Sequence, residues 1–161
     1  MEDSALVRIS HKVDYGVRAM VALARIDKGP AGEPVTREAL AEGEGIPATF
    51  LDEILRTLRN HDLVQSHRGP DGGWTIGRAA REITVADVIR ALEGPLASVR
   101  GIRPHDLGEA GVEEPLVSLW VAVRAALRSV LEEVTIADLA AGKLPKSVAR
   151  LAASDDAWDS R

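Results

Sequence analysis

The chain has 161 residues, of which 45% are hydrophobic, 28% are charged and none is cysteine, and its formal net charge is −5. The length predicts one compact domain with an extra long element and argues against two enzyme-sized domains. The lack of cysteine excludes disulfides, thiol nucleophiles and cysteine-held zinc or iron–sulfur clusters.

Charge and hydropathy constrain the partners. The N-terminal residues Met1–Ser4 are acidic, and the apolar runs of the chain are only a few residues long, so we expect no export signal, no membrane partner and a cytoplasmic location. Nucleic-acid-binding proteins usually have a basic surface, whereas this chain has 20 Lys and Arg against 25 Asp and Glu. Any binding to DNA must therefore depend on the local placement of cations.

Three helices are predicted in the N-terminal part. Apolar residues recur at helical spacing over His11–Ile26, and Ser10 can cap this helix. Thr36 can cap a second, short helix, which Gly43 and Gly45 are expected to stop. Pro47 is tolerated in the first turn of a third helix. The residues expected to be buried on that helix are Phe50, Leu51, Ile54, Leu55 and Leu58.

A hairpin and a fourth helix follow. Two short extended runs, 63–68 and 74–76, flank the turn-rich loop 69–73, which predicts a β-hairpin. Thr84 then begins a capping-box pattern for a helix that ends at Gly94.

The C-terminal part contains a long amphipathic helix. From Leu116 onward, apolar residues step by three and four over about five turns, and Thr135 again resembles a cap, here of a short helix ended by Gly142.

The predicted organisation is a winged helix-turn-helix DNA-binding domain over 1–94, an irregular connector over 95–115, a dimerisation helix and a short C-terminal helix over 116–150, and a flexible tail over 151–161.

The order of these elements predicts the fold class. A helix, a short helix, a glycine turn, a helix and a hairpin form a winged helix-turn-helix, in which the second helix of the pair enters the major groove. We therefore expect a mainly α chain with a small β-hairpin wing and a long C-terminal dimerisation helix.

The third helix has an outer face suited to base edges. Thr49, Asp52, Glu53 and Arg56 follow the spacing i, i+3, i+4, i+7, so they share one side of the helix. A carboxylate can accept from cytosine N4, and Arg56 can bind guanine or a phosphate. The alternative is that Asp52, Glu53 and Arg56 only solvate the helix, with Asp52 and Arg56 forming an i, i+4 pair.

The wing adds a cation beside flexible backbone. Arg68 precedes a glycine-rich turn that permits close approach to a sugar-phosphate strand, and Arg68 itself can enter the minor groove. The alternative is an ordinary hairpin whose glycines only satisfy turn geometry. The predicted DNA-binding set is Thr49, Asp52, Glu53, Arg56, Arg59, His67, Arg68, Gly72 and Gly73.

The long helix has two interpretations. Its apolar stripe either folds back on its own domain or pairs with a second copy and sets the separation of two recognition helices, and we favour the second. The predicted dimerisation residues are Leu116, Leu119, Trp120, Val123, Leu127, Val130 and Leu131.

Four segments in fixed order resemble the Rrf2 family of regulators: 9–19, 45–51, 63–74 and 83–89. The resemblance covers residues 8–142 and implies a dimeric DNA-binding repressor or activator. It implies base contacts by Thr49, Asp52 and Glu53 and a minor-groove contact by Arg68. Many members hold an iron–sulfur cluster through cysteines in the connector, but this connector, 96–115, has none, so we expect no cofactor.

Other functions remain as alternatives. No catalytic or phosphate-binding motif stands out, so we do not expect an enzyme. His105 with its acidic neighbours, Asp106, Glu109, Glu113 and Glu114, forms either a hard-metal or small-ligand site or, more often, a solvated loop. We therefore expect a sequence-specific, homodimeric DNA-binding transcription regulator, with a repressor favoured and an effector undefined. The alternative is a winged-helix module that binds a protein partner and no DNA.

Overall fold

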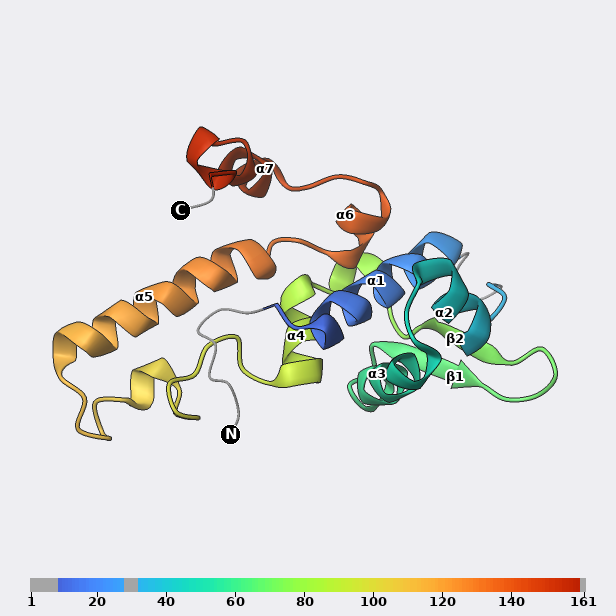
Figure 1. The fold of residues 1–161 in the computed structure, drawn as a ribbon, viewed down its shortest axis with the longest axis horizontal. Coiled ribbons are helices and arrows are strands. Elements are labelled where there is room, and N and C mark those ends of the chain that lie inside the picture. Colours follow the sequence, from blue (N-terminus) through green and yellow to red (C-terminus); the bar gives the residue numbers. More distant parts are fainter. Residues whose placement is uncertain (1–8, 28–31, 160–161) are drawn as a thin grey trace. The chain divides into compact units, whose positions relative to one another are not determined.

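A computed structural model describes residues 9–27 and 32–159 and shows a mainly helical chain with an antiparallel hairpin, as predicted (Figure 1). The acidic N-terminal residues and the last two residues of the expected flexible tail lie outside the described residues. The chain forms two compact units, 1–78 and 79–161, so the fourth helix belongs to the second unit.

The first two helices begin and end at local signals. Helix α1 spans His11–Ile26, and the Ser10 side chain caps it by accepting a backbone N–H. Helix α2 spans Arg37–Glu44 and is capped in the same way by Thr36. Gly45 ends α2 with φ of 63°, a left-handed conformation that favours glycine. The predicted boundaries of α1 and the predicted start of α2 are confirmed, whereas Gly43, expected together with Gly45 to stop α2, lies inside that helix.

Helix α3 spans Ala48–Asn60, and Pro47, expected in its first turn, is the N-cap residue immediately before it. One expectation for its buried stripe is wrong, because Phe50 is 54% exposed. Phe50 lies in the first turn of α3, where its ring forms an edge-to-face pair with the Tyr15 ring, with 6.4 Å between the ring centroids, instead of entering the core. The residues that α3 does bury are Leu51, Ile54, Leu55 and Leu58.

The wing is a two-stranded antiparallel sheet. Strand β1, Val64–His67, pairs with β2, Gly73–Ile76, as the hairpin prediction required. The sequence did not indicate a further pairing of Val35 with Trp74, whose backbone groups exchange hydrogen bonds of 2.9 and 2.8 Å. The hairpin is thereby attached to the segment that leads into α2.

In the second unit, α4 (Val85–Glu93) and α6 (Ile136–Ala140) each begin with a complete capping box. Their cap residues, Thr84 and Thr135, face each other in an isolated antiparallel bridge. The bridge contains two backbone hydrogen bonds, Val85 to Val134 at 2.9 Å and Ile136 to Ile83 at 2.8 Å. The starts of two helices far apart in the sequence are thus held together.

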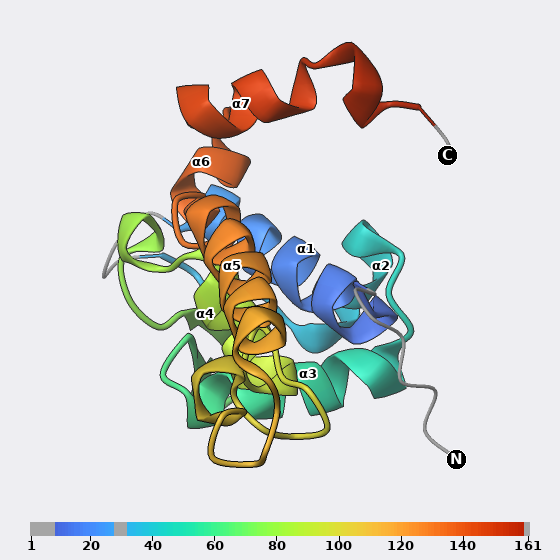
Figure 2. The same ribbon diagram turned by 90° about the vertical axis from the view of Figure 1, so that its left-hand side faces the viewer.

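Helix α5 spans Glu114–Leu131 and lies beside α4 (Figures 1 and 2). The connector before it contains an isolated bridge between Val99 and Ile102 and the short 3-10 helix Pro104–Asp106. Another 3-10 helix, Ala80–Glu82, precedes α4. None of the described helices is both long and apolar enough to cross a membrane.

The chain continues beyond α6 into helix α7, Lys146–Ala152, which the sequence did not clearly indicate. Only Val148 of this short helix is buried, so it has no long apolar stripe to reveal it. The segment expected to be a flexible tail contains the 3-10 helix Asp155–Ala157, and the Trp158 indole donates to the Ala152 carbonyl at 2.6 Å.

Removal of the hydroxyl at the start of α6 should destabilise the second unit. The Thr135 hydroxyl accepts from the Asp138 N–H at 3.1 Å and donates to its carboxylate at 2.7 Å. We expect Thr135→Ala to lower the free energy of unfolding by about 1 kcal/mol, a usual value for an N-cap, in urea denaturation at pH 7. Ser129→Ala, which removes an exposed hydroxyl on α5, is the control and should change stability by less than about 0.5 kcal/mol.

The same variant should respond to pH. The hydrogen bond from the Thr135 side chain, followed by that from its backbone N–H, lowers the pKa of Asp138 below its ordinary value. Stability from a lowered carboxyl pKa is present above the unfolded value of about 3.9 and disappears as pH falls through the folded pKa. The cost of Thr135→Ala should therefore shrink below pH of about 4, and an undiminished cost there would contradict this account.

Candidate nucleic-acid interface

The outer side of α3 carries the predicted base-contacting residues. Thr49, Glu53 and Arg56 are exposed, and the Arg56 side chain is 66% accessible. Asp52 is partly covered, with 28% of its side chain accessible. The structure therefore brings these four side chains to one polar face, opposite the buried stripe of α3.

Cations from three helices neutralise the carboxylates on this face. Asp52 accepts from Arg56 of its own helix at 2.6 Å and lies 3.6 Å from Arg37, the first residue of α2. Glu53 pairs with Lys12 of α1 at 3.0 Å. The i, i+4 pair that the sequence allowed is thus present, but it is part of a larger network.

Arg37 also belongs to this network through Glu38, at 2.6 Å. The hydrogen bond between them raises the pKa of Arg37 and lowers the pKa of Glu38, so both stay ionised near neutral pH. The sequence did not indicate Arg37 and Lys12, because helical spacing within α3 gives no information about which side chains of α1 and α2 reach it. Their positions in the first turns of the preceding helices are the only sequence signal.

The remaining predicted cations are exposed. Arg59 lies in the last turn of α3, and Arg68 follows β1 at the start of the wing turn. The His67 ring lies across the hairpin, with Nε2 2.8 Å from the Thr75 hydroxyl. His67 is therefore held by the sheet, whereas no hydrogen bond or ion pair to any described residue fixes the Arg68 side chain.

Two wing glycines are required by close backbone approach. A Cβ on Gly72 would lie 2.3 Å from the carbonyl oxygen of His67, and a Cβ on Gly73 would lie 2.5 Å from that of Val35. Both distances are shorter than any real carbon–oxygen contact. The structure thus supplies a folding reason for these glycines, which does not conflict with the predicted approach to DNA.

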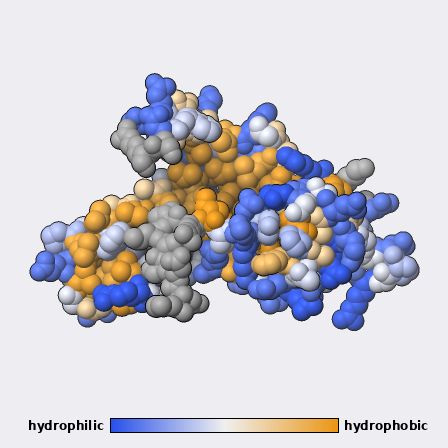
Figure 3. Space-filling view, in the orientation of Figure 1, coloured by the Kyte–Doolittle hydropathy of each residue, from blue (hydrophilic) through white to orange (hydrophobic). Residues whose placement is uncertain are grey.

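The predicted dimerisation face lies on α5. No α5 residue is fully buried within the described chain, and Leu116 and Leu119 are 44% and 51% exposed. The other five predicted residues, Trp120, Val123, Leu127, Val130 and Leu131, are half-buried. Hydrophobic surface is visible along α5 in the left part of Figure 3.

This arrangement defines a winged helix-turn-helix protein: two helices joined at a glycine turn, a polar outer face on the second helix and a hairpin wing with an exposed arginine. Residues 9–142 match the family model of Rrf2, described as an iron-dependent transcriptional regulator. The chain belongs to the Rrf2 family.

Relatives and solved structures agree with this assignment. The chain is 49% identical over 146 residues to an HTH-type transcriptional regulator of Mycobacterium tuberculosis, covering 91% of this chain and 89% of that protein. It resembles the structure of CymR, the global cysteine regulator of Bacillus subtilis, with a TM-score of 0.71, 32% identity and coverage of 86% and 99%. IscR of T. potens gives a TM-score of 0.66, 32% identity and coverage of 84% and 88%.

The residues present do not fit the iron that the family description names. The chain has no cysteine to hold an iron–sulfur cluster. The described residues contain no group of three or more His, Asp or Glu side chains that could hold a metal ion. His105 Nδ1 already accepts from Arg124 at 2.8 Å, so that guanidinium would repel a metal cation there.

A methyl group at Gly73 should detach the wing from α2. In Gly73→Ala, the new Cβ would overlap the Val35 carbonyl, so the two hydrogen bonds between Val35 and Trp74 must break or lengthen. We expect a loss of about 2 kcal/mol in the free energy of unfolding, near the sum for two backbone hydrogen bonds. Guanidinium denaturation of the whole chain measures it.

Gly43→Ala is the matched control. Gly43 lies inside α2, and its Cβ would meet nothing within 4 Å. Alanine favours a helix over glycine, so this variant should gain up to about 1 kcal/mol. Equal destabilisation by the two variants would contradict the role given to Gly73.

Proposed function

We propose that this protein is a cytoplasmic, homodimeric transcription repressor that binds specific DNA sequences, with α3 in the major groove and the wing at the adjacent minor groove. The observation that carries the proposal is the exposed polar face of α3 with Thr49, Asp52, Glu53 and Arg56 on one side of the helix. Repression by occupancy of an operator needs no surface beyond this DNA-binding face.

The ion pairs on α3 allow Arg56 to reach DNA at low cost. Arg56 is the more exposed partner of Asp52, and Arg37 lies 3.6 Å from the same carboxylate. When Arg56 turns toward a guanine or a phosphate, Asp52 keeps a cation beside it. The cost of leaving a carboxylate unpaired is therefore avoided.

The same network explains how a chain with a negative net charge could still bind DNA through α3. The carboxylates of α3 are matched by Lys12, Arg37 and Arg56, so the face need not repel phosphates although the whole chain is acidic. Arg59 and Arg68 add exposed positive charge at the end of α3 and on the wing. We propose that His67, Gly72 and Gly73 place the wing backbone and Arg68 against the sugar-phosphate strand.

Fluorescence anisotropy with DNA from the upstream region of the gene tests this function. Arg56→Ala and Arg68→Ala should each weaken binding by about 1–3 kcal/mol, the usual value of an arginine contact in a groove. Loss of Arg56 should also relax sequence preference, whereas loss of a phosphate contact should weaken all sequences alike.

Arg81→Ala is the control for charge alone. The Arg81 side chain is 80% accessible and its ion pair with Glu82 is long, at 4.0 Å. Each variant is compared on the upstream DNA and on a scrambled duplex at one near-physiological salt concentration. Equal affinity for both duplexes, or equal losses in all three variants, would exclude sequence-specific binding through α3 and the wing.

The partner proposed for α5 is a second copy of the chain. The helix has 18 residues and is therefore about 27 Å long, and none of its apolar residues is fully buried within the described chain. A two-fold axis repeats the same patch on both subunits, so a continuous apolar stripe is self-complementary. Pairing of these helices would also set the spacing of two α3 helices on consecutive half-sites.

A charge on this stripe should separate the subunits. We expect Leu119→Asp to convert a dimer into a monomer in sedimentation equilibrium and to reduce DNA affinity, because two half-sites are then bound independently. Leu151→Asp, at a 60% exposed position on α7, should leave the dimer intact. A wild-type monomer at micromolar concentration, or a dimer that survives Leu119→Asp, would contradict the assignment.

A further inference from the structure

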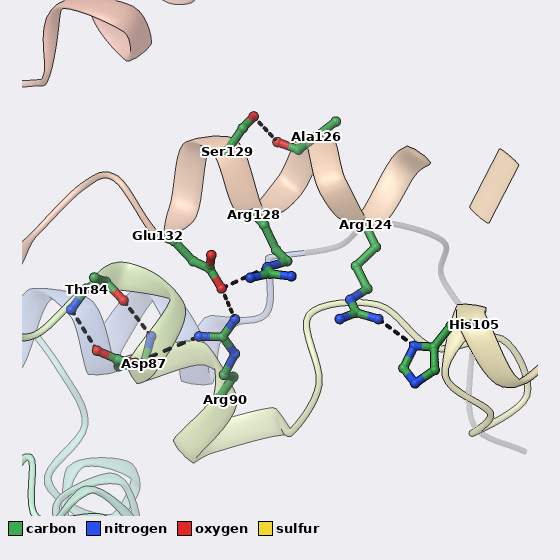
Figure 4. Close-up of polar contacts among 9 residues, drawn as sticks. All are labelled: Thr84, Asp87, Arg90, His105, Arg124, Ala126, Arg128, Ser129 and Glu132. Carbon is green, nitrogen blue, oxygen red and sulfur yellow. Dashed lines mark hydrogen bonds and ion pairs between the residues drawn. The ribbon is translucent and has the colours of Figure 1, made fainter. Parts of the chain in front are cut away.

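The second unit contains a cavity of about 340 Å³ lined by residues of α4, the connector and α5. Four of the lining side chains are arginines: Arg90 of α4, Arg103 of the connector, and Arg124 and Arg128 of α5. Pro95 and Leu96 supply an apolar part of the wall. Figure 4 shows three of these arginines projecting from α4 and α5 toward a common space above the connector.

Two of the arginines are held by one carboxylate. Arg128 Nε donates to Glu132 at 3.0 Å, and Arg90 donates to the same oxygen. Asp87 lies 3.8 Å from Arg90. These hydrogen bonds, from Arg128 first and then Arg90, lower the pKa of Glu132, so it stays ionised and fixes both guanidiniums at the cavity.

The other two arginines have no carboxylate partner within the described chain. Arg124 donates to Nδ1 of His105 at 2.8 Å, an arrangement in which this nitrogen is an unprotonated acceptor. The far side of the same ring, Nε2, lies 3.4 Å from Asp106. Arg103 forms no side-chain hydrogen bond or ion pair with any residue that the structure describes, so its donors are directed at solvent.

The cavity therefore has more positive than negative charge. Four guanidiniums line it, and the carboxylates that contact them are Glu132 and Asp87. Each guanidinium has five N–H donors in a planar fork, so donors remain on all four after the observed contacts are made. Paired forks of this kind suit the oxygens of carboxylates and phosphates.

We propose that this cavity binds a small organic anion with two or more carboxylate or phosphate groups. Its volume lies at the lower end of the range of about 300–1,000 Å³ for small-molecule sites. The anionic groups would meet Arg103 and Arg124, whose charges are unmatched, and the carbon skeleton would lie against Pro95 and Leu96. Glu132 keeps the remaining two guanidiniums in place and limits the charge that the ligand must supply.

We infer that this ligand is the effector of the regulator, and this inference rests on the proposed function. Arg124 and Arg128 lie on α5, the helix proposed to pair with a second copy, and Arg90 lies on α4. An anion that bridges Arg124 of α5 and Arg103 of the connector would hold α5 against the connector and so change how α5 presents its apolar stripe. Binding and regulation are separable, because binding is measured on the protein without DNA.

Isothermal titration calorimetry of the full chain tests the site with four probes: citrate, succinate, fructose 1,6-bisphosphate and ribulose 1,5-bisphosphate. We expect one ligand to bind per chain. A comparison of the Kd values of the carboxylate probes with those of the phosphate probes will identify which group the site prefers. Arg103→Gln should weaken binding by about tenfold or more, as expected for a lost hydrogen bond to a charged group. Because the Arg103 side chain has no hydrogen-bond or ion-pair partner among the described residues, this variant should fold normally.

Arg100→Gln is the matched control, since Arg100 lies in the same connector, is exposed and does not line the cavity. It should bind as the wild type does. The site is refuted if none of the four probes binds with a Kd below about 1 mM, or if both variants lose affinity equally. If a probe binds but leaves the anisotropy titration with DNA unchanged, the effector role is refuted and the anion site stands.

Discussion

The orientation of α3 depends on the burial of four side chains, Leu51, Ile54, Leu55 and Leu58, each at most 1% exposed. A helix advances about 100° per residue, so burying this stripe fixes the direction of every other side chain on α3. Rotation by one residue would carry Asp52 toward the core, where an unpaired charge costs several kcal/mol or more. The polar face of α3 is thus a direct consequence of hydrophobic packing.

Packing of α1 and α2 against α3 also determines the charge of that face. Lys12 and Arg37 reach Glu53 and Asp52 because the first turns of their helices lie near α3. An acidic chain can in this way present a face whose carboxylates are already neutralised. Each of these pairs is exposed and contributes little to stability, so the network matters for the surface potential more than for the fold.

The second unit is organised around the bridge between Thr84 and Thr135. It joins two capping boxes and thereby holds the start of α4 against the start of α6, with α5 as the connection between them. One consequence is that Arg90 and Arg128 can share Glu132 across α4 and α5. The arginine-lined cavity and the partly covered apolar stripe are therefore products of the same arrangement of α4 and α5.

The sequence by itself determined the helix starts at Ser10, Thr36, Thr84 and Thr135, the hairpin, and the family, because caps, turns and apolar periodicity act over a few residues. It also placed Arg56 on the outer face of α3. Only the tertiary structure decided the exposure of Phe50, the pairing of Val35 with Trp74 and the contact between Lys12 and Glu53. These depend on which elements pack together, and a local pattern contains no information on a partner 41 residues away. The cavity could not be predicted from the sequence for the same reason, since its arginines come from three separate segments that only the folded chain brings together.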